Sequence, residues 1–193
     1  MDAAIAPGEV LTLMGPSGSG KSTLISAISG FLPVSFSCTG SIWLNGQNIT
    51  TIPPEKRRVG VLFQDTLLFP HFSVLQNFLF ALPPGGGMAQ RCEIAISLLA
   101  DIALQDFADR DPATLSGGQK ARVALARVIA SKPNALLLDE PFSKLDADLR
   151  DSMRELVFAE VARRKIPTLL VTHDKDDAKA ANGRIMTLSN HKN

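Results

Sequence analysis

Residues 15–22 decide the fold of this chain, and their sequence is Gly15-Pro-Ser-Gly-Ser-Gly-Lys21-Ser22. The apolar run Val10–Met14 precedes them and a helical pattern over Lys21–Gly30 follows. Glycines let successive backbone N–H groups point inward, and the following helix adds partial positive charge at its N-terminus. A loop of this spacing between a strand and a helix predicts a phosphate-binding site. The alternative is a glycine-rich turn that only links strand to helix.

In this phosphate loop we expect Lys21 to reach the β- and γ-phosphates and the Ser22 hydroxyl to bind Mg2+. The expected ATP-binding residues are Gly15, Pro16, Ser17, Gly18, Ser19, Gly20, Lys21, Ser22 and Thr23.

The composition is typical of a single globular domain. The chain has 193 residues, of which 45% are hydrophobic and 20% charged, so we expect one domain over residues 1–193. The formal net charge of +1 provides no general attraction to nucleic acid. No apolar run approaches the roughly 18 residues of a membrane-spanning helix. If the protein acts at a membrane, we expect something other than such a helix to hold it there.

Three further apolar runs end abruptly at polar residues. Val59–Phe63 leads to Gln64, Ala135–Leu138 leads to Asp139, and Thr168–Val171 leads to Thr172 and His173. Unbroken runs of Val, Leu and Ile are typical of strands buried on both faces of a parallel sheet. Since ligands of such sheets lie beyond the carboxyl ends of the strands, these polar residues are candidates for the site.

The remaining patterns predict helices and a hairpin. Helices are expected over Gln119–Ala130 and Leu149–Arg164, and a short hairpin around Asn45-Gly46. Residues 72–113 form a separate block, with helices expected over Ser73–Leu82 and Met88–Leu104. We therefore expect an α/β core over residues 1–71 and 114–193, with a mainly parallel sheet, a small antiparallel sheet and an inserted α-helical subdomain over about residues 72–113.

Asp139 and Glu140 form a carboxylate pair at the end of an apolar strand. We expect Asp139 to hold Mg2+ beside Ser22 and Glu140 to polarise the attacking water. The alternative is a pair that only caps the next helix, although Pro141 follows directly.

The run Leu115-Ser116-Gly117-Gly118-Gln119 begins a helix. Ser116 is a natural N-cap, and the alternative is that it does nothing more. Paired glycines lower helix stability but leave N–H groups accessible to an anion. We therefore predict a second anion-binding element at the start of this helix.

Three more positions have open alternatives. His173 is a candidate contact to the γ-phosphate, or a packed or solvated histidine. Gln64 is a candidate ligand of Mg2+ or water, or a polar loop residue. Ser143, Leu145 and Asp146 lie just past Glu140, and Asp146 could serve only as an N-cap.

Together these motifs resemble the ATP-binding cassettes of ABC transporters, over nearly the whole chain. Residues 15–22 match the Walker A loop, Gln64 the Q-loop, residues 115–119 the signature motif and residues 135–139 the Walker B strand. Glu140 matches the catalytic glutamate, Ser143–Asp146 the D-loop and His173 the switch histidine. The stretch around Gln64 is similar to that of bacterial importers.

This resemblance implies a P-loop NTPase that hydrolyses ATP with Mg2+ as a head-to-tail homodimer. Each ATP would contact one Walker A loop and the partner's signature glycines. Glu140, His173 and Gln64 would be catalytic, and Ser22, Gln64 and Asp139 would bind the metal. The implied partners are integral membrane permease subunits, contacted near Phe69–Val74, and an extracytoplasmic solute-binding protein, at the cytoplasmic face of the inner membrane, with no nucleic acid.

One departure from the family concerns the N-terminal segment. The family usually has one or two further strands before Walker A, with an aromatic residue that stacks on adenine, whereas the 14 residues before Gly15 include no aromatic residue. We expect an incomplete small sheet, Trp43 and Phe36 in the core, and a loss of stacking of roughly 1 kcal/mol. The alternatives are a truncated or mis-assigned start, a cassette that binds nucleotide but turns over poorly, or a soluble ABC ATPase outside transport.

Overall fold

A computed structural model describes residues 2–63, 65 and 67–188 of the chain. The chain packs as two compact units. The first comprises Met1–Val61, Pro133–Glu140 and Phe158–Asn193, and the second comprises Leu62–Lys132 and Pro141–Val157. The prediction of a single domain with an inserted helical subdomain stays a prediction, and each unit is described by itself.

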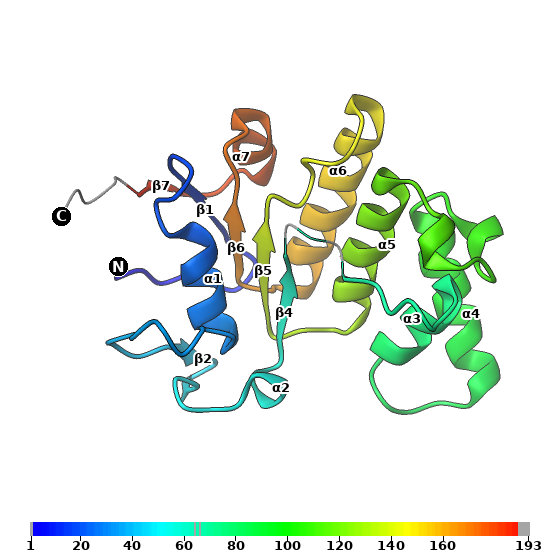
Figure 1. The fold of residues 1–193 in the computed structure, drawn as a ribbon, viewed down its shortest axis with the longest axis horizontal. Helices are drawn as coiled ribbons and strands as arrows, with labels where there is room; N and C mark the ends of the chain where they lie inside the picture. Colours follow the sequence, from blue (N-terminus) through cyan, green and yellow to red (C-terminus); the bar gives the residue numbers. More distant parts are fainter. Residues whose placement is uncertain (1, 64, 66, 189–193) are drawn as a thin grey trace. The chain divides into compact units, whose positions relative to one another are not determined.

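The first unit is built on the main sheet, whose strand order is β4-β5-β6-β1-β7 (Figure 1). The strands are β1 (Val10–Met14), β4 (Val59–Leu62), β5 (Ala135–Asp139), β6 (Thr168–Val171) and β7 (Ile185–Thr187). The pairs β1–β6, β1–β7 and β5–β6 are parallel. The side chains of β1, β5 and β6 are almost all buried, which explains why these strands lack polar alternation.

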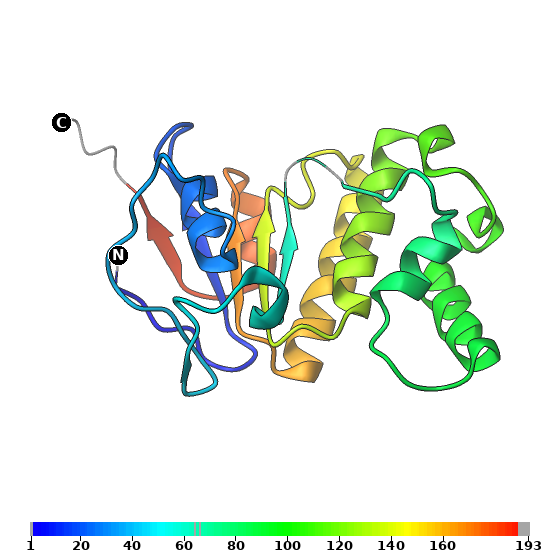
Figure 2. The same ribbon diagram turned by 60° about the horizontal axis from the view of Figure 1, so that its bottom comes forward.

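Two helices of the first unit lie on opposite faces of this sheet, α1 (Lys21–Ser29) on one and α7 (Lys175–Ala181) on the other (Figures 1 and 2). The strand order explains this placement. The connection through α1 leads from β1 toward β4 at one edge, whereas the connection through α7 leads from β6 to β7 at the other edge. Right-handed crossovers in opposite directions place their helices on opposite faces.

A separate two-stranded antiparallel sheet follows α1. It consists of β2 (Trp43–Leu44) and β3 (Gln47–Asn48), joined through Asn45 and Gly46, and the short helix α2 (Pro54–Arg57) comes next. Asn45 has φ 51° and Gly46 φ 77°, as a type I′ turn requires. The expectation that Trp43 and Phe36 are core residues was wrong, because their side chains are 64% and 55% exposed.

The second unit is mainly helical. Its helices are α3 (Val74–Ala81), α4 (Met88–Asp101) and α5 (Gly117–Ala130), with 3-10 turns at Gln105–Phe107 and Pro112–Thr114. The helix α6 (Ala147–Arg164) begins in this unit and continues into the first. Within the described residues, no helix has both the length and the apolar character that a membrane span requires.

Candidate functional site

The carboxyl ends of three neighbouring strands bring the candidate residues of the first unit to one edge of the sheet. Val171 of β6 pairs with Leu13 of β1 on one side and with Asp139 of β5 on the other. The backbone N–H of Glu140 donates to the Val171 carbonyl at 2.9 Å, which extends this register by one residue. The phosphate loop, the Asp139-Glu140 pair and His173 therefore all follow strands that end at the same level.

The phosphate loop has the backbone conformation that its glycines allow. Gly18 has φ 78° and Gly20 has φ 91°, both in the left-handed region, and no atom lies within 4 Å of a Cβ added at either position. The Nζ of Lys21 donates to the carbonyls of Gly15 at 2.9 Å and Pro16 at 2.8 Å, and lies 3.4 Å from the Ser19 hydroxyl. The lysine ammonium thus lies over the loop itself.

Helix α1 starts at Lys21, directly after this loop, so the loop lies at the N-terminus of the helix. Gly20 is its N-cap and supplies no side chain to the free N–H groups of the first turn. The first turn also contains no acidic residue. Its partial positive charge is therefore left for an anion, and the Ser22 side chain in this turn is exposed.

Asp139 is the last residue of β5 and is only 5% exposed. Among the described residues, no hydrogen bond or ion pair reaches its carboxylate. A nearly buried carboxylate without a partner is costly, because burial removes its hydration. Such a group fits a ligand position for a hard cation such as Mg2+.

Glu140 and His173 form a direct contact between the ends of β5 and β6. The Oε1 atom of Glu140 lies 2.7 Å from Nδ1 of His173, with side-chain exposures of 13% and 74%. This hydrogen bond and the negative charge of Glu140 raise the pKa of His173 above its ordinary value. Glu140 itself has φ 50°, a left-handed conformation that is unusual for a residue with a side chain.

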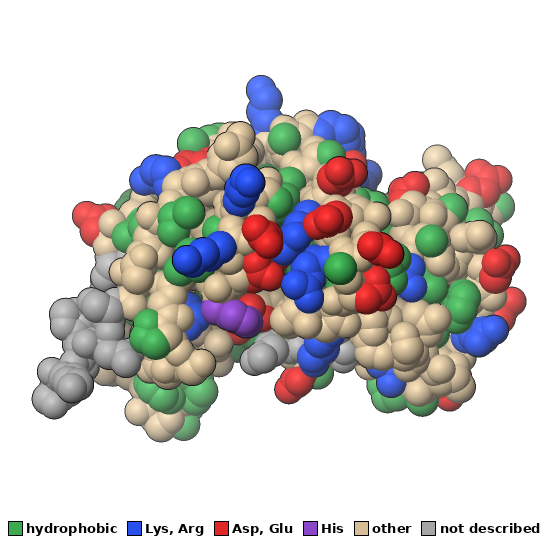
Figure 3. All heavy atoms as spheres, turned by 90° about the horizontal axis from the view of Figure 1, so that it is seen from above, with side chains coloured by type: hydrophobic (Ala, Val, Ile, Leu, Met, Phe, Trp, Pro, Cys, Tyr) green, Lys and Arg blue, Asp and Glu red, His purple; other side chains and the backbone are tan. Residues whose placement is uncertain are grey.

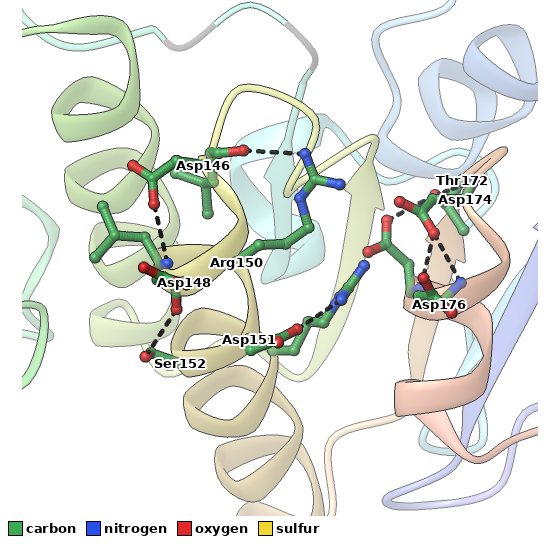
Figure 4. Close-up of polar contacts among 12 residues, drawn as sticks. Asp146, Asp148, Arg150, Asp151, Ser152, Thr172, Asp174 and Asp176 are labelled. Atoms are coloured by element: carbon green, nitrogen blue, oxygen red, sulfur yellow. Dashed lines mark hydrogen bonds and ion pairs between the residues drawn. The ribbon is translucent and has the colours of Figure 1, made fainter.

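Two local hydrogen-bond systems fix the backbone around His173. The Asp174 carboxylate accepts hydrogen bonds from the N–H groups of Asp176 and Asp177 and caps α7 (Figure 4). The buried Thr172 hydroxyl donates to Asp177 at 2.8 Å. The residues on both sides of His173 are therefore held in place, while the imidazole is exposed.

The second unit contains the glycine pair that begins α5. Ser116 and Gln119 form a capping box, in which the Gln119 N–H donates to the Ser116 hydroxyl and the Ser116 N–H donates to the Gln119 side chain. A Cβ added at Gly117 would have no atom within 4 Å, whereas one added at Gly118 would lie 3.6 Å from the Lys144 carbonyl. The predicted N-cap role of Ser116 is confirmed.

Residues 143–146 lie beside this glycine pair in the same unit. Leu145 is buried, whereas Ser143 and Asp146 are exposed. Asp146 caps α6 by accepting a hydrogen bond from the Leu149 N–H at 3.1 Å, and Arg150 donates to the Leu145 carbonyl at 3.0 Å (Figure 4). Asp146 therefore does serve as an N-cap of α6.

A model of the ABC transporter family matches residues 1–143. The chain belongs to this family. The described elements also agree with solved cassettes: a dimeric post-hydrolysis structure of the ATP-binding cassette MJ0796 with ADP and Pi has a TM-score of 0.84 and 30% identity, and the match covers 97% of this chain and 84% of that one. The predicted cassette fold and the ABC-type ATPase class are confirmed.

Two sequence relatives extend this comparison. The uncharacterized ABC transporter ATP-binding protein YnjD of Escherichia coli strain K12 is 53% identical over 173 residues, which are 90% of this chain and 80% of YnjD. The spermidine/putrescine import ATP-binding protein PotA 1 of Pseudomonas aeruginosa is 45% identical over 194 residues. This match covers 98% of the chain but 52% of PotA 1, so the chain spans about half of that relative's length.

The residues matched to Walker A, Walker B, the catalytic glutamate and the switch histidine lie in the first unit, and those matched to the signature motif and the D-loop lie in the second. Their roles stay predictions. Gln64, which the sequence matches to the Q-loop, lies outside the described residues. Its neighbour Asp65 is exposed and lies 3.5 Å from the Lys144 Nζ, a pair that contributes little to stability. On the face that Figure 3 shows, acidic and basic side chains are interspersed.

Sequence patterns did not reveal three buried or half-buried polar residues of the cassette. Arg57 is 7% exposed and Asn77 is fully buried. Asn77 bonds to the carbonyls of Phe69 and Ser73, and Arg127 donates to its side-chain oxygen at 3.1 Å. For Asn77, the only signal of burial was its position within an otherwise apolar helix, and Arg57 in its charged stretch gave no such signal.

Proposed function

We propose that this chain is the ATP-hydrolysing subunit of an importer and works as a head-to-tail homodimer. In this proposal each ATP lies between the phosphate loop of one chain and the residues Leu115–Gln119 of the other. Closure of the dimer on ATP and its opening after hydrolysis drive the permease.

The observation that carries the proposal is Gly117. This residue is exposed, lies in the first turn of α5 and has no neighbouring atom where a Cβ would be. Alanine would be at least as favourable there, because glycine loses more backbone entropy than alanine when it enters a helix. The monomer therefore has no structural need for glycine at this position. A bare helix N-terminus that must approach a partner's phosphate does have that need.

The hydrolytic half of the proposed site lies in the first unit. Lys21 would exchange its contacts with the loop carbonyls for contacts with the β- and γ-phosphates. Glu140 would accept a hydrogen bond from the attacking water, and His173, held by Glu140, would contact the γ-phosphate. These contacts position the water and stabilise charge, which is the main contribution of the protein to phosphoryl transfer.

Mg2+ fits this site through the chemistry of its donors. Asp139 offers a nearly buried carboxylate without a protein partner among the described residues, and Ser22 offers an exposed hydroxyl in the first turn of α1. We propose these two residues as ligands, together with Gln64. When bound, the ion would neutralise charge on the β- and γ-phosphate oxygens.

The proposed permease contact is the aromatic cluster, defined as Phe69, His71, Phe72 and Phe80. The Phe69 and Phe80 rings meet edge to face at 4.8 Å, yet Phe80 is 64% exposed. Asn77 holds the backbone of Phe69 through two hydrogen bonds, and Arg127 donates to the Asn77 side chain. Exposed, rigid aromatic side chains are frequent anchors of protein interfaces.

Import and membrane location are supported by the relatives. PotA 1 is a spermidine/putrescine import protein by its name, and the importer-like stretch around Gln64 agrees with it. We propose that the cassette lies at the cytoplasmic face of the membrane, bound to integral permease subunits, and that an extracytoplasmic solute-binding protein delivers the solute. Selection of the solute would then reside in these partners.

The shared site can be tested with two matched substitutions. Ser116 and Ser73 form the same capping box, at α5 and α3 respectively. Ser116→Arg and Ser73→Arg therefore each remove one N-cap, which costs about 1 kcal/mol. Only Ser116→Arg places a long side chain where the partner's γ-phosphate would lie.

We expect Ser116→Arg to abolish ATPase activity and ATP-dependent dimer formation while ADP binding to the single chain is retained. Ser73→Arg should leave all three near the wild-type level in the purified protein. An unchanged ATPase rate in Ser116→Arg, or equal losses in both variants, would refute the shared site.

A further inference from the structure

Helix α1, which carries the phosphate loop, is weakly anchored through its side chains. It has nine residues, and only Ile25 and Ser29 are buried. Helix α5 buries nine of its fourteen residues. Isolated helices shorter than about 12–15 residues are marginal in water, so tertiary contacts must hold α1 in place.

Arg57 supplies such contacts at the C-terminal end of α1. Its Nη1 atom donates to the carbonyls of Ala27 at 3.0 Å and Ile28 at 2.7 Å, two of the last-turn carbonyls of α1. Its positive charge also lies at the negative end of the helix dipole. Arg57 comes from α2, about thirty residues further along the chain.

The same guanidinium joins α1 to the segment that follows the β2–β3 hairpin. Its Nε donates to the Ile52 carbonyl at 2.7 Å and its Nη2 to the Thr50 carbonyl at 2.8 Å. All three nitrogens therefore have carbonyl partners, and the side chain is nearly buried, which fits a rigid planar fork. A lysine could not reproduce this geometry.

Gly30 makes room for the guanidinium at the end of α1. It has φ 87° and its N–H closes the helix on the Ala27 carbonyl. A Cβ at Gly30 would lie 2.9 Å from the Arg57 Cζ. The sequence thus provides both the cation and the space that it occupies.

We propose that Arg57 is a positioning residue for the phosphate loop, because it fixes the axis of α1 and with it the N-terminal turn that receives the phosphates. The inference rests on the proposed nucleotide site. Arg57 acts through α1 and does not contact the nucleotide. The β5 and β6 ends that carry Glu140 and His173 make no hydrogen bond with it.

The matched control is Arg91, which makes the same kind of contact in the second unit. Its guanidinium donates to the carbonyls of Leu79, Leu82 and Pro83 at the C-terminal end of α3. Arg57→Gln and Arg91→Gln each remove one guanidinium from a helix end. The probe is ADP, whose binding to a single chain requires neither hydrolysis nor a partner.

We expect Arg57→Gln to weaken ADP binding about tenfold, which corresponds to about 1.4 kcal/mol. The KM for ATP should rise while kcat at saturating ATP stays within about twofold of wild type. The reason is that the lost interaction energy binds the ground state and the transition state equally. Arg91→Gln should bind ADP like the wild type. Arg57→Lys, which keeps the charge, should give a smaller loss and replaces Arg57→Gln if that variant does not fold.

Unchanged ADP affinity in the Arg57 variants, or equal weakening in Arg91→Gln, would overturn the positioning role. A fall in kcat without a change in KM would also contradict it. These outcomes differ from a failure of the proposed function, in which the wild-type chain binds ADP but shows no ATP-dependent dimer. A wild-type chain that binds no ADP would contradict both the positioning role of Arg57 and the proposed function.

Discussion

The Glu140 carboxylate and the His173 imidazole meet at 2.7 Å across the ends of two neighbouring parallel strands. Their backbones bring them together because Val171 pairs with Asp139, and one and two residues later the chain reaches Glu140 and His173. Strand register thus brings the two residues to neighbouring strand ends, and the backbone that follows each strand completes the contact. It joins the two residues that we propose to act on the attacking water and the γ-phosphate.

The first prediction concerns the pKa of His173. Glu140 raises it mainly through their hydrogen bond and also through its charge, and Asp174 and Asp177 add smaller effects in the same direction. In Glu140→Gln the negative charge is absent, so the pKa of His173 should fall toward its ordinary value of 6.5. Proton NMR titration of the imidazole measures this change, with His71 as the internal control. No difference between wild type and Glu140→Gln would contradict the charge effect.

The sign of the linked stability effect follows from the raised pKa. Protonation of His173 is more favourable in the folded chain than in the unfolded chain. The contact with Glu140 therefore contributes fully to the stability of the fold at pH values below the ordinary pKa of histidine. This contribution is lost as the pH rises through the pKa of His173 in the folded chain. The difference in thermal stability between wild type and His173→Gln should therefore be larger at pH 5.5 than at pH 8.5. Because the imidazole is 74% exposed, we expect the difference to be small.

The second prediction separates binding from folding at Lys21. Its Nζ bonds only to exposed or half-buried atoms of the phosphate loop, so Lys21→Ala should hardly change the melting temperature. Loss of a charged hydrogen-bond donor to phosphate, roughly 1.5–3 kcal/mol, should weaken ATP binding by about 10- to 100-fold. Calorimetric titration with ATP and thermal unfolding measure the two effects. Unchanged ATP affinity would rule out the Walker A assignment.

The third prediction uses the open space at Gly117. Gly117→Ala should keep or raise the free energy of unfolding, by up to roughly 1 kcal/mol, because the helix gains a better residue and no clash arises. The same change should weaken ATP-dependent dimer formation, since the added methyl group lies where the partner's phosphate would approach. Denaturant unfolding and light scattering test both parts. A variant that is more stable and dimerises normally would count against the shared site.

The fourth prediction concerns the support of the aromatic cluster. Asn77 is fully buried and bonds to the backbone of Phe69 and Ser73 and to Arg127. Asn77→Ala leaves these groups without partners and should cost about 2–4 kcal/mol of unfolding free energy. Phe80→Ala, at a 64% exposed ring, should cost much less and serves as the control. Equal losses would show that the cluster does not depend on Asn77.

Long apolar strands and their flanking motifs were predictable from the sequence. The strands over Val10–Met14 and Thr168–Val171 have the predicted bounds, and Ala135–Asp139 extends its prediction by one residue. These strands are buried on both faces, so hydrophobicity alone marks them. The register that pairs Val171 with Leu13 and Asp139 was not predictable, because identical-looking apolar runs do not encode which strands are neighbours.

Short and exposed elements were not predicted, because they lack the long apolar runs that mark the buried strands. The edge strand Ile185–Thr187 has three residues and an exposed Ile185, and the helix Lys175–Ala181 is polar and alanine-rich, so neither has a clear periodic pattern. Trp43 was expected in the core, but the hairpin that carries it has only two residues in each strand and leaves it exposed.

Around the candidate site, the sequence predicted which residues lie at strand ends, while the structure supplied their contacts. The Glu140–His173 pair and the carbonyl contacts of Lys21 depend on side-chain conformation. Arg57 was invisible as a functional candidate, because arginine in a charged stretch such as Glu55–Arg58 is typical of a solvated turn. Arg57 is buried because it bonds to the last carbonyls of α1, and the local sequence around Arg57 does not indicate this contact.

The central claim is that two copies of this chain complete each ATP site, and the mass of Glu140→Gln in solution tests it most directly. This variant should bind ATP but hydrolyse it too slowly to reopen the dimer. With Mg2+ and ATP, light scattering should give twice the 20.7 kDa of one chain, and with ADP the mass of a single chain. Two results together would contradict the account. The Glu140→Gln chain would remain a monomer at saturating ATP, and the wild-type hydrolysis rate per chain would not change with protein concentration.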